Sequence, residues 1–167
     1  MDQCQRTNAP GAAPERDMLL AWLQHLRDTI VCKLDGLDEE QVRRTHAPSS
    51  LTLLGLIKHL TDVERTWFRE RFAGEDPPDA DAWSAERSWR IEPDDTAAAL
   101  IAAYRDECAA SDRIVRAHGP EDLAARAPPH RESVTLRWIL MHMVQETARH
   151  VGHADLIREA IDGQTGT

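Results

Sequence analysis

The stretch LRWILMHMVQETARHVGHADLIREAI, residues 136–161, decides the fold of this chain. Its inward-facing residues recur at steps of three and four, which is the spacing of one face of an α-helix. They are Leu136, Ile139, Leu140, Met143, Thr147, Val151, Ile157 and Ile161. Ser133 or Thr135 is suited to cap the start of this helix, and Gly163 to end it. We therefore expect a long amphipathic helix.

Three similar patterns precede this one, and they predict three more long helices. The first begins at Glu15 and weakens at Gly36, and the second runs from Ser50 or Thr52 to about Phe72. The third runs from about Asp94 to Ala117, with Asp94 or Asp95 as its cap. A short helical turn is expected in residues 38–44, capped by Asp38. No alternating pattern typical of a strand occurs. The chain is thus predicted to be all-α, a four-helix bundle.

The length of 167 residues suits one domain. Residues 1–14 are polar and contain two prolines, so we expect a disordered N-terminal tail, and the bundle is expected over residues 15–167. Residues 74–95 form a long acidic loop, and a loop of this length is usually either functional or held down by its own side chains. Its two tryptophans, Trp83 and Trp89, are expected to pin it to the bundle, and a substrate could lie under it.

The composition argues against several partners. Lys and Arg number 20 and Asp and Glu 29, which gives a net charge of −9, so a nucleic-acid partner is not expected. The chain has no apolar run long enough to cross a membrane and no secretory signal at its start, and we expect a cytoplasmic protein.

The three cysteines are Cys4, Cys32 and Cys108. Their odd number and the absence of a CxxC pair suggest neither a disulfide framework nor a cysteine-based zinc site. Cys32 and Cys108 are predicted to be small core residues, and Cys4 to lie in the loose tail.

Polar residues share one narrow face of the last helix. At about 100° per residue, with His142 at 0°, Glu146 lies at about 40°, His150 at about 80° and His153 at about 20°. This face overlaps the apolar stripe, and buried His and Glu side chains need a partner. Imidazole and carboxylate groups are ordinary ligands of divalent transition metals, and bundle cores hold such sites.

A third ligand must come from another helix, and His59, at the margin of the buried stripe of the second helix, is the best donor. Three protein ligands with an open position are typical of a catalytic metal site. A pair made by His150 and His153 is also possible from spacing alone. The other four histidines are expected to be solvated: His25, His46, His118 and His130.

Two runs resemble a known group. LRWILMHMVQETARHVGHADLIRE (residues 136–159) resembles the last helix of the DinB-like superfamily, and LGLIKHLTDVERTWF (residues 54–68) resembles its second helix. The resemblance covers about residues 17–163. It implies a four-helix bundle with a metal held by three side chains, of which His59 is the first.

The resemblance also implies which residues of the last helix are metal ligands. The superfamily usually has His-x3-His followed by Arg-Gly-Gln, and aligning Gly152 with that glycine makes His150 a ligand and puts the other ligand at Glu146. A His-Glu-His triad is similar to that of the mycothiol-dependent maleylpyruvate isomerase branch. His153 then takes the glutamine position, and either His153 or His142 is expected to orient a ligand or carry a proton.

The activity implied is that of a thiol transferase or isomerase, in which a low-molecular-weight thiol bound to the metal as thiolate attacks a small electrophile. Zinc or nickel is the expected metal, with iron as a further candidate, and mycothiol the natural thiol. The family also suggests a homodimer. Two alternatives stay open: a non-enzymatic, stress-related metal-binding protein, and a metal-dependent hydrolase.

Overall fold

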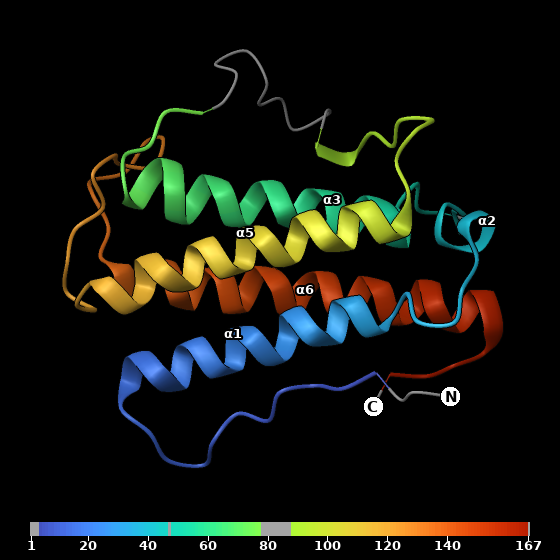
Figure 1. Ribbon diagram of the computed structural model, residues 1–167, viewed down its shortest axis with the longest axis horizontal. Helices are drawn as coiled ribbons and strands as arrows, with labels where there is room; N and C mark the ends of the chain where they lie inside the picture. The colour runs from blue at the N-terminus through green and yellow to red at the C-terminus, as the bar shows by residue number, and fades with distance from the viewer. Residues whose placement is uncertain (1–3, 47, 78–87, 167) are drawn as a thin grey trace.

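The computed structural model describes residues 4–46, 48–77 and 88–166, and these form a bundle of long helices (Figure 1). They are α1 (Glu15–Cys32), α3 (Leu53–Glu64) continued by the π-helix η1 (Arg65–Phe72), α5 (Ala97–Ala117) and α6 (Leu136–Asp162), with the short α2 (Glu39–Val42) between α1 and α3. Within the described ranges, the β-structure is one isolated bridge between Leu123 and Thr135. The predicted all-α four-helix bundle is confirmed. None of the described helices has the length and apolar character to span a bilayer.

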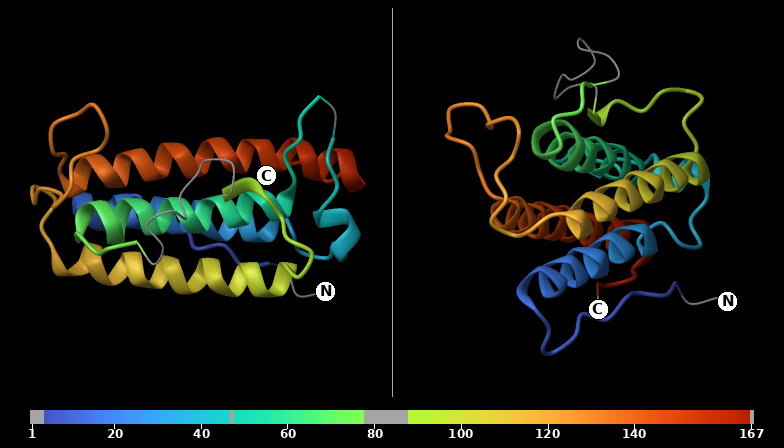
Figure 2. Two further views of the ribbon diagram at one scale, coloured as in Figure 1. Left: turned by 90° about the horizontal axis from the view of Figure 1, so that it is seen from above. Right: turned by 60° about the vertical axis from the view of Figure 1, so that its left-hand side comes forward.

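The helices enclose a shared core, with α1 packed most closely on α6 and α3 on α5 (Figure 2). Two apolar clusters fill the two ends of the bundle, one around Leu56 and Ile157 and the other around Phe68 and Ile139. Buried polar groups lie among these clusters: Arg27, Glu64, Ser111, Thr147 and His150. The interior of the bundle is therefore not wholly apolar.

The helix ends follow the capping residues of the sequence with one exception. Thr52 and Thr135 cap α3 and α6, their Oγ1 atoms accepting hydrogen bonds from Gly55 N at 2.9 Å and Trp138 N at 3.3 Å. Gly163 ends α6 in the left-handed conformation, with φ 79°.

The exception is α5, which starts at Ala97 and not near Asp94. Thr96 is its cap, because its Oγ1 accepts from Ala99 N at 3.2 Å. The Asp95 carboxylate has other partners: it accepts from Lys58 Nζ at 2.7 Å and Glu92 N at 2.8 Å.

The predicted second helix is not a single α-helix, because its last eight residues form the π-helix η1. The wider turn continues at the end, where Ala73 N donates to Phe68 O at 2.9 Å, five residues back. A π-turn has more residues than an α-turn, so it changes which side chains face inward. Phe68 and Phe72 are buried there, and Trp67 is left partly exposed.

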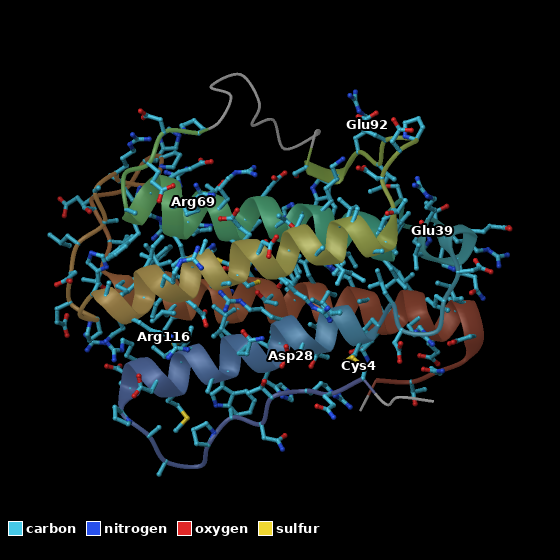
Figure 3. All side chains as sticks on the ribbon, in the orientation of Figure 1. Cys4, Asp28, Glu39, Arg69, Glu92 and Arg116 are labelled. Atoms are coloured by element: carbon cyan, nitrogen blue, oxygen red, sulfur yellow. A yellow bond between two sulfur atoms is a disulfide. The ribbon has the colours of Figure 1, made fainter. Side chains whose placement is uncertain are left out.

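The cysteine prediction is wrong in one respect. Cys4 and Cys32 form a disulfide, and Cys32 is partly exposed at the end of α1 and not a core residue (Figure 3). The reason is the path of residues 4–14, which run back along α1: Thr7 N donates to Asp28 Oδ2 at 2.8 Å, and Thr7 O lies 2.8 Å from His25 Nδ1. Cys108 is a buried free thiol, as predicted.

Candidate metal centre

The three side chains predicted as ligands meet between α3 and α6. His59 comes from α3, and Glu146 and His150 lie one turn apart on α6. Glu146 Oε1 is 3.1 Å from His150 Nε2 and 3.7 Å from His59 Nε2. The three ligand atoms all lie within 4.8 Å of one another, and among the described residues no other group of His, Cys, Asp or Glu does this.

This donor set fits a divalent transition-metal ion. Metal bonds of about 2.0–2.2 Å in a tetrahedral site put neighbouring ligand atoms roughly 3.3–3.6 Å apart. The separations of 3.1 and 3.7 Å are close to this spacing. Two imidazole nitrogens and one carboxylate oxygen suit zinc, nickel or iron.

The residues Ser88 and Trp89 hold the His59 ring in place. Ser88 is 2% exposed, and its Oγ lies 3.2 Å from His59 Nδ1. Trp89 stacks on the same imidazole, with ring centroids 3.8 Å apart and planes 13° apart. Metal-binding histidines commonly use their second nitrogen in such a hydrogen bond, which orients the first toward the metal.

Trp89 also contacts His150, edge to face, at a centroid distance of 5.4 Å. The sequence predicts that Trp89 pins the loop to the bundle, and it gives no prediction for Ser88. Neither residue belongs to a helical pattern, so no periodicity pointed to them. Trp83, the other loop tryptophan, lies outside the described residues.

Glu146 is held as a carboxylate. Its hydrogen bond with His150, and then that with His59, keeps the pKa of Glu146 well below its ordinary value, and Arg149, with Nη1 at 3.3 Å from Oε2, adds to this. Hydrogen bonds to the charged form of an acid favour that form. A carboxylate already ionised has no proton to lose before it binds a cation.

His153 is a neighbour of the cluster and not a member of it. Its Nδ1 lies 3.3 Å from Nδ1 of His150, whose Nε2 faces Glu146. Burial, and then the nearby His150 and Arg149, lower the pKa of His153. The buried His150 ring thus presents its two nitrogens to two different groups.

His142 lies one turn before Glu146, in an aromatic cluster beside the ligands. Its ring stacks on Trp138 at a centroid distance of 5.2 Å and 11°, and lies 4.4 Å from Trp67 of η1. Burial lowers the pKa of His142. The guanidinium groups of Arg71 and Arg131 lie over Trp67 and Trp138, at 5.3 and 5.4 Å.

The other four histidines do not join the site. His118 and His130 are exposed, as expected. His25 and His46 are partly exposed, and so are less open to solvent than His118 and His130. His25 is covered by residues 4–14 through its contact with Thr7 O.

Two comparisons with known proteins bear on the family of this chain. A search of curated proteins found no match. The family model described as mycothiol-S-transferase matches residues 18–163, which include both helices that carry the His-Glu-His cluster. The chain therefore belongs to the mycothiol-S-transferase family, a DinB-like family of thiol transferases.

Proposed function

We propose that the protein joins mycothiol, through its sulfur, to a small electrophile at a divalent metal held by His59, Glu146 and His150. The observation that carries this is the convergence of the three ligand atoms within 4.8 Å of one another in a chain of this family. Zinc or nickel is the proposed metal, with iron as a further candidate. A homodimer is also proposed on the family resemblance, and a cytoplasmic location on the lack of an apolar run and of a secretory signal in the sequence.

When bound, the cation supplies positive charge that lowers the pKa of a thiol, so that the thiol reacts as its thiolate. The carboxylate of Glu146 cancels part of that charge. Ser88 and Trp89 keep Nε2 of His59 directed at the site, so that little reorientation is needed on binding. His150, which is buried, holds its position through Glu146 on one side and His153 on the other.

Two further histidines have proposed roles in the reaction. His142 takes the proton that the thiol releases, since burial favours its neutral form and it lies one turn from Glu146. His153 orients His150 through its Nδ1 contact. In the transfer itself, the sulfur forms a bond to the electrophilic carbon, and the leaving group departs with the bonding electron pair.

The first test is the metal content of protein purified without a His-tag. We expect about one equivalent of a transition metal per chain, as in other three-ligand sites. His59→Ala, Glu146→Ala and His150→Ala should each lose it, and the exposed His118→Ala, as the matched control, should keep it. If His153→Ala loses metal and Glu146→Ala keeps it, the ligand assignment is wrong.

The second test is turnover of a fluorogenic alkyl halide with and without mycothiol. Thiol-dependent product, lost in the three ligand variants, supports the transferase. Turnover of ester or amide substrates without any thiol would instead identify a metal-dependent hydrolase. Metal binding with no turnover in either assay would favour a non-enzymatic metal-binding protein.

A further inference from the structure

A cavity of about 630 Å³ lies beside the candidate metal centre and shares a wall with it. The shared wall is Trp89, which borders the cavity and also stacks on His59. Gly55, which lines the cavity, precedes His59 by four residues on α3, a rise of about 6 Å. In Figure 1, the segment after residue 87 passes over α3 on its way to α5. A ligand in this cavity therefore lies within one helical turn of the His-Glu-His cluster.

The lining of the cavity is amphipathic. Leu51, Ile91 and the indole of Trp89 supply apolar surface, and the hydroxyl-bearing Ser50 and Thr52 supply hydrogen-bonding groups. Among the described residues of the lining, Arg43 is the charged one, and its guanidinium donates to the backbone carbonyls of residues 92 and 95. No carboxylate belongs to this described part of the lining. Such a surface suits a neutral ring with an apolar face and many hydroxyl groups.

The thiol that names the family has such a group. Mycothiol carries its cysteine sulfur on an uncharged, hydroxyl-rich sugar–cyclitol unit. We propose, building on the proposed function, that this cavity binds the sugar–cyclitol part of the thiol, and that the sulfur reaches the metal past the edge of Trp89. The cavity volume lies within the usual range for small-molecule sites, about 300–1,000 Å³.

The cavity wall is tightly packed at Gly55. A Cβ at this position would lie 3.0 Å from Thr52 Oγ1 and 3.5 Å from the Trp89 carbonyl oxygen. A side chain at residue 55 would press on both the α3 cap and the wall that the cavity shares with His59. We therefore use other positions to fill the cavity, so that the metal centre is left intact.

The test compares two ligands with the metal-loaded protein by calorimetry: mycothiol, and N-acetylcysteine, which lacks the sugar–cyclitol unit. Wild-type protein should bind mycothiol at least about tenfold more tightly, a difference that one well-packed ring can supply. Leu51→Trp should abolish this preference and leave both the metal content and the N-acetylcysteine affinity unchanged. Leu123→Trp, an exposed position at the far end of the bundle, is the matched control. Ser50→Trp, at an exposed rim position, serves as a second filling variant if Leu51→Trp unfolds.

Three results would overturn the proposal. In the first, Leu51→Trp and Ser50→Trp, the variants that fill the cavity, bind mycothiol as tightly as wild type does. In the second, they weaken the binding of mycothiol and of N-acetylcysteine equally. In the third, they raise only the KM for the electrophile, which would assign the cavity to the electrophilic substrate. A separate arm does not depend on the metal. Saturation-transfer NMR with the thiol-free sugar–cyclitol fragment and metal-free protein should show binding to wild type and Leu123→Trp, and none to the filling variants. Absence of metal in wild-type protein would contradict the proposed function, whereas absence of fragment binding would contradict this inference.

Discussion

The indole of Trp89 lies flat on the imidazole of His59, with centroids 3.8 Å apart and planes at 13°. The hydroxyl of the preceding residue, Ser88, meets the same ring at Nδ1, at 3.2 Å. Two consecutive residues thus restrain one candidate ligand through its face and its edge. This arrangement connects the segment before α5 to the interior of the bundle and makes it part of the site.

Trp89→Ala should weaken metal binding by about 10–100-fold, which is the usual cost of losing a group that orients a metal ligand. Trp89→Phe, which keeps an aromatic face against His59, should stay near the wild-type affinity. The measurement is competition for zinc or nickel with a chromophoric chelator. Trp22→Ala, at a 48% exposed position on α1, is the control. An unchanged affinity in Trp89→Ala would show that the stack does not orient His59.

Glu64→Gln should destabilise the bundle by up to about 3–5 kcal/mol, because it leaves the buried Arg27 with the partly exposed Asp112, 2.8 Å away, as its remaining charged partner. Arg27 donates to both Glu64 oxygens at 2.7 Å, and both side chains are almost fully buried. The double variant Arg27→Met with Glu64→Leu should recover most of the loss, since it buries no charge.

The free energy of unfolding in urea measures these effects. Arg137→Met breaks exposed ion pairs with Glu15 and Glu121 and should change stability little. If Glu64→Gln were no more damaging than this control, the buried pair would contribute little to the fold.

Alkylation should find no reactive thiol in the native, unreduced protein. Burial raises the pKa of the Cys108 thiol far above its ordinary value, and Cys4 and Cys32 are paired. Unfolding without reductant should expose one thiol, and unfolding with reductant all three cysteines. Mass spectrometry after iodoacetamide treatment counts them, with Cys108→Ser as the control. Two additional thiols in the unreduced, unfolded sample would contradict the disulfide.

Acid should destabilise the metal-free protein partly through His142. Because burial lowers the pKa of His142 in the folded state, the unfolded chain binds the proton more readily. Stability from this group is therefore present above the ordinary histidine pKa of 6.5 and is lost as the pH falls toward the folded value.

The variant His142→Phe keeps a ring against Trp67 and Trp138 and has no proton to bind. Its stability should fall less than that of wild type between about pH 7.5 and pH 5 in urea titrations. The variant keeps the charged groups that affect the pKa of His142, which are Glu146, Arg131 and Arg149. Met141→Ala, on the exposed side of the same helix, should follow wild type. Equal slopes for all three proteins would show that His142 does not titrate differently on folding.

The helices and much of the site could be predicted from local pattern. Apolar residues that recur every three or four positions in residues 136–161 define the inward face of this helix. Glu146 and His150 lie on that face, whichever helices it packs against. Thr52, Thr135 and Gly163 mark helix ends because capping acts over a few residues. The π-turns of η1 do not follow from the local pattern, because Phe68 and Phe72 pack against residues of other helices. The late start of α5 does not follow from it either, because Asp95 pairs with Lys58 of α3.

The sequence by itself determined that this protein is a helical bundle with a row of His and Glu on its last helix, since periodicity is a property of neighbouring residues. Only the tertiary structure decided that His59 lies within reach of Glu146, and that Ser88 and Trp89 restrain it. It also decided that Cys4 pairs with Cys32, across 28 residues. Contacts between distant segments depend on how the helices pack and where the connecting chain runs, and no local pattern encodes them.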